Sequence, residues 1–74
     1  MLRVGVREVA ISGETIRLGQ LLKLAGVADS GGEAKAILAA GVLVNGASEA
    51  RRGRQLHPGD VVEAAGELLR VVAR

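Results

Sequence analysis

The chain has 74 residues, with ten Lys and Arg against eight Asp and Glu, and it contains no Cys, Phe, Tyr or Trp. This length allows one domain at most, with a core that is only just sufficient to fold. The missing cysteines exclude disulfides, thiol redox chemistry and cysteine zinc sites. The missing aromatic residues exclude nucleic-acid modules that stack bases on aromatic rings. We therefore expect a single domain over residues 1–74 with an aliphatic core.

No segment has the pattern of a signal peptide or of a membrane span. Near the N-terminus valines alternate with charged residues, and no apolar region of the secretory type follows. The longest uncharged apolar run covers about residues 36–44, whereas a membrane span needs about 20 apolar residues. We therefore expect a cytoplasmic protein without a membrane partner.

The first half of the chain predicts a strand followed by a helix. Residues 4–11 alternate weakly between apolar and polar, which predicts a strand that Ser12-Gly13 ends. An amphipathic helix over about residues 18–25 follows, because apolar residues recur at helical spacing. Gly26 is placed to cap this helix in the left-handed conformation. The stripe of this helix consists of Leu18, Leu21, Leu22 and Ala25.

A second helix begins a few residues later. Ser30 and Glu33 match the Ser-x-x-Glu capping box, which marks a helix start. Ala34, Ile37 and Leu38 form one buried stripe, and Gly41 ends the helix. Because so few residues join the two helices, we expect them to pack as a pair.

After Gly41 the apolar period changes to two, which predicts strands. Asn45-Gly46 is a favoured hairpin turn between strands over residues 42–45 and 47–50. The remaining elements are, in chain order, a strand end at Leu56, a turn over 57–60, a strand over 61–64, a turn at Ala65-Gly66 and a last strand over 67–72. The pattern predicts an α+β domain in which two packed helices lie against a small antiparallel β-sheet that includes the N-terminal strand.

Catalytic and metal-binding patterns are absent from the sequence. His57 is the single histidine, and no close carboxylate pair accompanies it, so a zinc site lacks ligands. Ser30, His57 and Asp60 could be combined into a hydrolytic triad, but Ser30 is better explained as a helix cap and His57 as an exposed turn residue. We expect no enzymatic activity, metal, cofactor or small-molecule substrate.

The sequence RRGR at residues 51–54 concentrates positive charge in a chain that is nearly balanced. Between Arg17 and His57 there are six Lys and Arg against three Asp and Glu, and three of these six lie within four residues. The guanidinium fork fits phosphate oxygens, and Gly53 would let the loop backbone approach a ligand. The loop therefore predicts one wall of a surface that binds the phosphates of a nucleic acid.

Two glycines could form a second part of this surface. Gly31 and Gly32 fall in the first turn of the second helix, where unpaired N–H groups and the helix dipole favour a phosphate. They lack the Lys-Ser/Thr of a P-loop, and a tight junction between helices explains them equally well. Arg17, Lys23 and Lys35 would each pass for solvated charges, but they lie in the elements next to this site.

The motifs LGQLLK, SGGEAK, VNG, RRGR and PGD, in this order over about residues 16–64, resemble a known family. It is the S-four-type RNA-binding domain, named after small-subunit ribosomal protein four, and the short stand-alone bacterial members are most similar. The resemblance implies an αL RNA-binding motif, in which RNA lies across the helix pair and the basic loop. The RNA-binding residues expected from the resemblance and from the loop are Arg17, Lys23, Gly31, Gly32, Lys35, Arg51, Arg52, Gly53 and Arg54.

The chain departs from the family pattern at two positions. Many members carry an acidic residue where this chain has Gly19, and many carry an arginine where it has Gly31. The second departure removes a usual phosphate contact, for which the glycine pair and Lys35 could substitute.

Three functions are compatible with the sequence. The favoured one is a monomeric protein that binds structured RNA, either rRNA or tRNA, through its basic surface. The alternatives are a helix-turn-helix DNA-binding protein and a protein-interaction adaptor on the ribosome. A recognition helix needs several outward polar side chains, which Gly31-Gly32, Ala36 and Ala39 do not supply.

Overall fold

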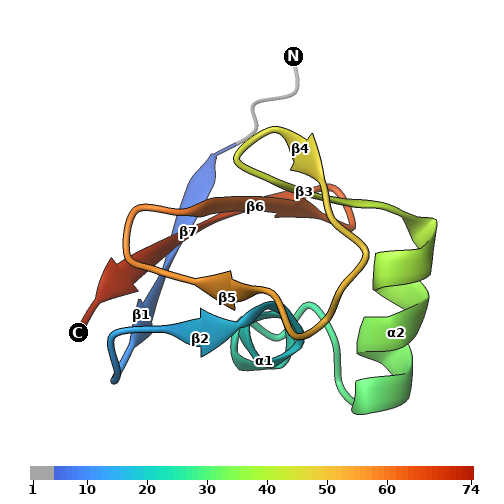
Figure 1. Cartoon of the computed structure of the whole chain (residues 1–74), viewed down its shortest axis with the longest axis horizontal. Helices are drawn as coiled ribbons and strands as arrows, with labels where there is room; N and C mark the ends of the chain where they lie inside the picture. Colours follow the sequence, from blue (N-terminus) through green and yellow to red (C-terminus); the bar gives the residue numbers. More distant parts are fainter. Residues whose placement is uncertain (1–4) are drawn as a thin grey trace.

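The computed structural model describes residues 5–74, which form two helices and two β-sheets (Figure 1). The elements are β1 (Val6–Ile11), β2 (Ile16–Arg17), α1 (Leu18–Leu24), α2 (Gly31–Ala40), β3 (Val42–Val44), β4 (Ala47–Ser48), β5 (Gln55–Leu56), β6 (Val61–Ala64) and β7 (Glu67–Ala73). The predicted α+β class is confirmed. Val4, with which the predicted first strand began, lies outside the described residues.

The main sheet has five strands in the order β1-β7-β6-β3-β4. Its neighbours are antiparallel except for β1 and β7, which run parallel, with Val6 opposite Leu68 and Ile11 opposite Ala73. The prediction of an antiparallel sheet is therefore wrong at this pair, and the sheet is mixed. A period of two identifies a strand but not its direction. The helices and the other strands lie between β1 and β7 in the chain, so the connection is long enough for the crossover that a parallel pair needs.

A second sheet consists of β2 and β5 alone, with Ile16 opposite Leu56 and Arg17 opposite Gln55. The sequence predicted a strand end at Leu56 but no strand at residues 16–17, because two residues are too few to show a period. This sheet fixes the segment before α1 beside the end of the arginine loop.

The predicted ends of the helices are confirmed by their backbone geometry. Gly26 follows α1 with φ 75°, and Gly41 caps α2 with φ 124°, both outside the range that most side chains adopt. The Ser30 Oγ accepts a hydrogen bond from the Glu33 N–H at 3.1 Å. The Glu33 carboxylate accepts from the Asp29 N–H at 3.3 Å rather than from Ser30, so the capping box is displaced by one residue.

The predicted hairpin turn at Asn45-Gly46 and the predicted turn at Ala65-Gly66 are both present. Asn45 and Gly46 have φ of 51° and 83°, and Ala65 and Gly66 have φ of 51° and 77°, the positive pair that a tight hairpin needs. The strand predicted over residues 47–50 is shorter, because β4 ends at Ser48.

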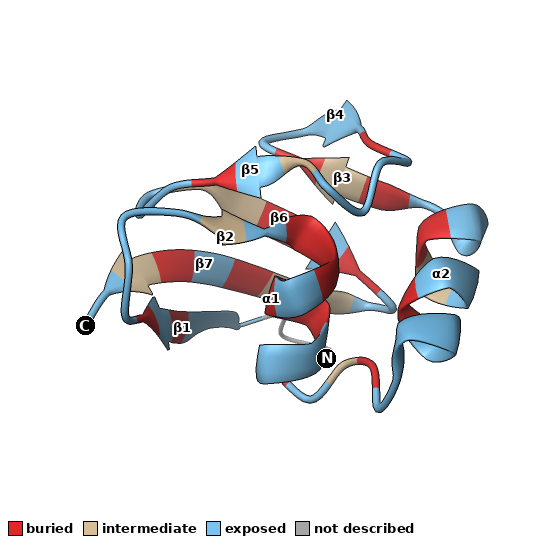
Figure 2. Cartoon of the chain, turned by 60° about the horizontal axis from the view of Figure 1, so that its bottom comes forward, coloured by how far each residue is buried: buried red, intermediate tan, exposed pale blue. Residues whose placement is uncertain are grey.

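The core lies between α1 and the main sheet, and the buried side chains are all aliphatic except Glu49. Leu18, Leu21 and Leu22 of α1 are fully buried, whereas α2 buries only Ala34 and Leu38. Figure 2 shows α2 at one end of the molecule with most of its surface exposed. Neither of the two described helices is long and apolar enough to cross a membrane. The junction between the helices therefore remains open at the surface, where it can form a site.

Candidate nucleic-acid interface

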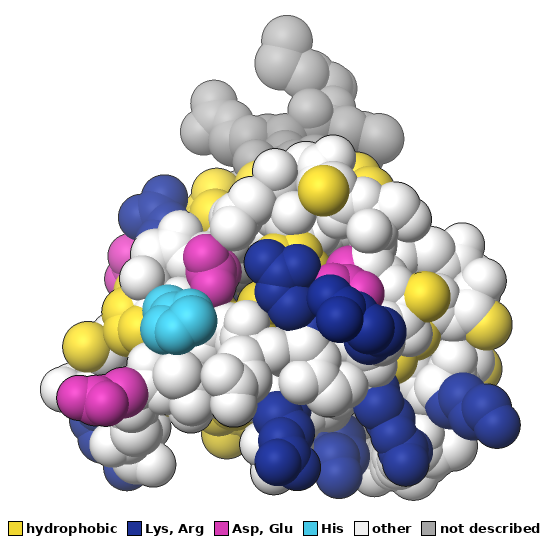
Figure 3. Space-filling model, in the orientation of Figure 1, with side chains coloured by type: hydrophobic (Ala, Val, Ile, Leu, Met, Phe, Trp, Pro, Cys, Tyr) yellow, Lys and Arg dark blue, Asp and Glu magenta, His cyan; other side chains and the backbone are white. Residues whose placement is uncertain are grey.

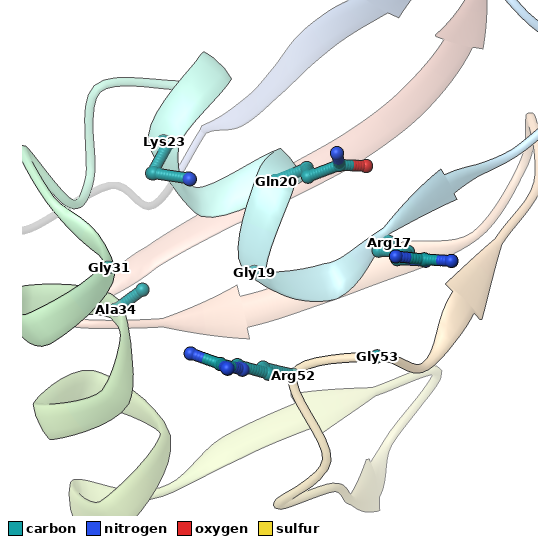
Figure 4. A pocket seen from close by; sticks show the side chains of 8 residues that line it. All are labelled: Arg17, Gly19, Gln20, Lys23, Gly31, Ala34, Arg52 and Gly53. Carbon is teal, nitrogen blue, oxygen red and sulfur yellow. The ribbon is translucent and has the colours of Figure 1, made fainter.

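A hollow of about 350 Å³ lies where the start of α1, the start of α2 and the arginine loop meet (Figure 4). We call it the basic hollow, and its lining residues are Arg17, Gly19, Gln20, Lys23, Gly31, Ala34, Arg52 and Gly53. Among these residues three are cations and none is acidic. The structure thus brings together five of the residues predicted for the site, namely Arg17, Lys23, Gly31, Arg52 and Gly53.

A second depression adjoins the first along α2. It is lined by Lys35, Leu38, Ala39, Ala50 and Arg52, so Arg52 borders both. In Figure 3 most of the Lys and Arg side chains on the face shown lie over its centre and its lower part. Four of the predicted cations, Arg17, Lys23, Lys35 and Arg52, therefore line two adjoining depressions.

The arginine loop contains a β-turn over residues 51–54. The Arg54 N–H donates to the Arg51 carbonyl at 3.2 Å, which places Arg52 and Gly53 at the centre of the turn and the other two arginines at its ends. Figure 4 shows the Arg52 side chain extending from the loop toward the start of α2. Apart from Gly53 and its two chain neighbours, no described heavy atom lies within 4 Å of the position that a Cβ of Gly53 would take, so this corner is open.

The main chain of this turn caps the first turn of α1. The Leu18 N–H donates to the Arg54 carbonyl at 2.8 Å, and the Gly19 N–H donates to the Arg52 carbonyl at 2.9 Å. A Cβ on Gly19 would lie 3.3 Å from the Cβ of Arg52, which is a tight contact. The absence of a side chain at Gly19 therefore allows the loop to approach the helix.

Glu49 holds the two arginines at the ends of the turn. Its carboxylate accepts from Arg51 Nε at 3.1 Å, from Arg51 Nη2 at 3.1 Å and from Arg54 Nη1 at 3.0 Å, and it also accepts from the Arg51 main-chain N–H at 3.1 Å. The Glu49 residue is only 8% exposed, whereas the side chain of Arg51 is 76% exposed. We call this group the Glu49 clasp.

The electrostatics of the clasp differ from those of Arg52. Hydrogen bonds from the Arg51 side chain, then from its main chain and from Arg54, lower the pKa of Glu49 from 4.5 to about 2, so the carboxylate is ionised at neutral pH. The same carboxylate raises the pKa of Arg51. Within the described part of the chain, Arg52 forms no hydrogen bond or ion pair through its side chain. Glu49 carries one negative charge and faces both Arg51 and Arg54, so among the three arginines of the loop Arg52 is the one whose side chain has no acidic partner in the described residues.

Glu49 was not predicted as a site residue from the sequence, and neither were Gly19, Gln20 and Ala34, which line the hollow. An acidic residue two positions before an arginine cluster was the available signal for Glu49. The alternation of residues 47–50 gave no reason to expect a buried carboxylate there.

The start of α2 lies at the edge of the basic hollow. The first N–H groups of a helix have no acceptor within it, and the Ser30 side chain takes only the N–H of Glu33. Gly31 lines the hollow, and the position of a Cβ on it is open. Gly32 lines neither depression.

The residues considered for a hydrolytic triad have structural roles. Ser30 caps α2, and the Asp60 carboxylate accepts from the His57 main-chain N–H at 2.7 Å and from Asn45 Nδ2 at 3.0 Å. Burial alone would raise the pKa of Asp60, but these hydrogen bonds lower it below its ordinary value. Residues 5–74 contain no group of three or more His, Asp and Glu side chains placed to hold a metal ion.

A helix pair, a small sheet and a basic loop that share one hollow define a compact α+β domain of a nucleic-acid-binding type. The sequence profile of the S4 domain family matches residues 9–72. The chain is also similar to a Bacillus subtilis (strain 168) protein described as probable ribosome maturation protein RlbA, with 54% identity over 59 residues, which are 78% of this chain and 83% of that protein. The chain therefore belongs to the S4 domain family, which confirms the resemblance seen in its motifs.

Proposed function

We propose that this protein is a non-catalytic RNA-binding protein that takes part in ribosome maturation by binding structured rRNA across the basic hollow. The observation that carries the proposal is that Arg17 and Lys23, from the continuous β2–α1 segment, and Arg52, from the arginine loop, line one hollow without an acidic lining residue. The similarity to a Bacillus subtilis protein described as a probable ribosome maturation protein supports rRNA rather than tRNA as the ligand.

The chemistry of the surface suits the backbone of folded RNA. Double-stranded RNA is recognised mainly through its shape, its phosphates and its 2′-hydroxyl groups, which requires cations and close backbone approach rather than aromatic rings. Lys23 and Arg52 supply the cations, and Gly31 and Gly53 leave open space beside them. Lys35 extends the same surface along α2.

The exposed face of α2 favours RNA over duplex DNA as the ligand. This face carries Gly31, Gly32, Ala36 and Ala39, which offer no side-chain donors or acceptors to base edges in a major groove. Lys35 and Glu33 are its exposed charged residues. A recognition helix of the helix-turn-helix type would present several polar side chains there.

The proposal is tested by measuring binding to small- and large-subunit rRNA transcripts by fluorescence anisotropy, with tRNA and duplex DNA as competitors. We expect Lys23→Ala and Arg52→Ala each to lower the affinity for rRNA about tenfold, because each removes one charged contact worth about 1.4 kcal/mol. The control is Arg74→Ala, since Arg74 is exposed and lines neither depression. Lys35→Glu should likewise weaken binding more than Arg74→Glu.

Each alternative function has its own outcome in this experiment. Equal competition by duplex DNA would support a helix-turn-helix protein. Association with ribosomal proteins that survives nuclease treatment, together with no binding to bare rRNA, would support an adaptor. An unchanged affinity of both alanine variants would exclude the basic hollow as the RNA-binding site.

A further inference from the structure

We infer that Glu49 is a positioning residue for RNA binding, and that Arg51 and Arg54 act through it to present Arg52 as the loop's phosphate contact. This inference rests on the proposed function and deepens it, because it divides the three arginines of the loop into two roles. The division follows from the surroundings of each side chain, because Arg51 and Arg54 face the Glu49 carboxylate and Arg52 lines the basic hollow.

The first step is the geometry of the turn. Arg51 and Arg54 occupy its ends, and both guanidinium groups converge on the carboxylate of Glu49 at 3.0–3.1 Å. Arg51 also donates its main-chain N–H to the same carboxylate, so the clasp fixes the backbone at the point where the turn begins. Bonds between a guanidinium and a carboxylate are strong and directional, and they restrict the loop more than a single neutral bond would.

The second step is the connection from the turn to the hollow. The carbonyls of Arg52 and Arg54 are held by N–H groups in the first turn of α1. The turn is thus fixed on one side by the clasp and on the other side by the helix. Arg52, at the centre of the turn, is left to extend into the space between α1 and α2 and borders both depressions (Figure 4).

The third step is the sign of the charge. Glu49 is an anion among three arginines, and an anion beside a phosphate site opposes phosphate binding through its charge alone. A purely electrostatic account therefore predicts that removing this charge strengthens RNA binding. The positioning account predicts the opposite, because loss of the clasp frees the turn and misplaces Arg52.

The two accounts are separated by Glu49→Gln, which keeps the size of the side chain and removes its charge. We expect its affinity for an rRNA transcript that the wild type binds to fall about tenfold, although the net charge of the chain becomes more positive. Circular dichroism and thermal melting show whether the variant is folded. An affinity equal to or higher than that of the wild type would overturn the inference.

A double-mutant cycle tests whether the effect passes through Arg52. In the Arg52→Ala background, Glu49→Gln should change the affinity by less than about twofold, because coupled residues are not additive. Independent tenfold losses in both backgrounds would overturn the positioning role of Glu49.

A second variant is decisive even if Glu49→Gln does not fold. Arg51→Lys keeps the positive charge at an exposed position but cannot bind both carboxylate oxygens as a planar fork. We expect a loss of RNA affinity that disappears in the Arg52→Ala background, whereas a direct contact between the Arg51 guanidinium and phosphate predicts the same loss in both backgrounds. If the wild type itself bound no rRNA, the proposed function would fail. If the wild type bound and these variants bound equally well, only the present inference would fail.

Discussion

The carboxylate of Glu49 decides what each neighbouring arginine can do. Arg51 and Arg54 share that carboxylate, while Arg52, at the centre of the same turn, faces the basic hollow. The residue type alone therefore does not determine the role of an arginine at this site, because that role depends on the partners of its side chain. Counting charges in RRGR treats all three arginines alike, and this is why the sequence predicted a surface but not its internal division.

The low pKa of Glu49 makes stability depend on pH in a defined range. Its pKa is about 2 in the folded protein and 4.5 ordinarily, so folding favours the ionised form. The stabilisation is complete at pH values above the ordinary pKa, and it is lost as the pH falls from about 4.5 toward 2. We expect the melting temperature of the wild type to decrease over this range.

The contribution of Glu49 is isolated by comparing melting curves of the wild type and Glu49→Gln from neutral pH down to about pH 2. The variant should show a smaller decrease. Asp60, whose pKa is also lowered, contributes to the remaining decrease, so Asp60→Asn serves as a parallel variant. Identical pH profiles for the wild type and Glu49→Gln would contradict the role assigned to the clasp.

At the scale of elements, α1 depends on the loop that caps it. This helix has seven residues and, within the described chain, no side-chain cap at Arg17. Isolated helices of this length are not stable in water, so tertiary contacts must complete it. The carbonyls of Arg52 and Arg54 do so from the loop that leads into β5, at the same end of the β2–β5 sheet, which couples the shape of the loop to the start of the helix.

Two glycines in first helical turns allow a matched test of this coupling. Replacing Gly by Ala in a helix normally stabilises it by up to about 1 kcal/mol. We expect this gain for Gly31→Ala, because outside the neighbouring backbone of its own helix no described heavy atom lies within 4 Å of the added Cβ. Gly19→Ala should show no gain or a loss, since its Cβ would lie 3.3 Å from the Cβ of Arg52.

The measurement is the free energy of unfolding from urea titration of both variants and the wild type. An equal gain at both positions would mean that the loop moves away from α1 without cost. The affinity for rRNA should fall in Gly19→Ala as well, because any shift of the loop carries Arg52 with it.

Elements with strong local signals were predictable from the sequence, and those that depend on distant partners were not. The Ser30 cap, the glycine after each helix and the two hairpin turns follow from the conformations that these residues favour locally. The parallel pairing of β1 with β7 and the two-residue strands β2 and β5 exist only because remote segments meet. In the candidate site, the convergence of the cations was predicted, whereas the buried carboxylate behind them was not.

For the whole molecule, the distribution of charge matters more than the net charge. The chain carries a formal charge of only +2 at pH 7. On β1 and β7, cations are paired with acids, Arg7 with Glu67 at 2.9 Å and Arg70 with Glu8 at 3.5 Å. The cations of the basic hollow have no acidic neighbour among its lining residues. A weakly charged protein can therefore present one locally positive site to a polyanion.

The salt dependence of binding tests this distribution. Each phosphate that a protein neutralises releases counterions and adds about 0.7–0.9 to the magnitude of the slope of log K against log salt concentration. We expect a Lys23→Ala, Arg52→Ala double variant to lower this magnitude by about 1.4–1.8 relative to the wild type, because two phosphate contacts are lost. Arg70→Ala, which removes an ion-paired cation outside the hollow, should leave the slope unchanged. The slopes come from anisotropy titrations with one rRNA transcript between about 50 and 200 mM salt. A wild-type affinity that did not change over this range would contradict charge recognition as such. An equal loss of slope in Arg70→Ala would show that the paired and unpaired cations contribute alike and that the hollow is not the site of charge recognition.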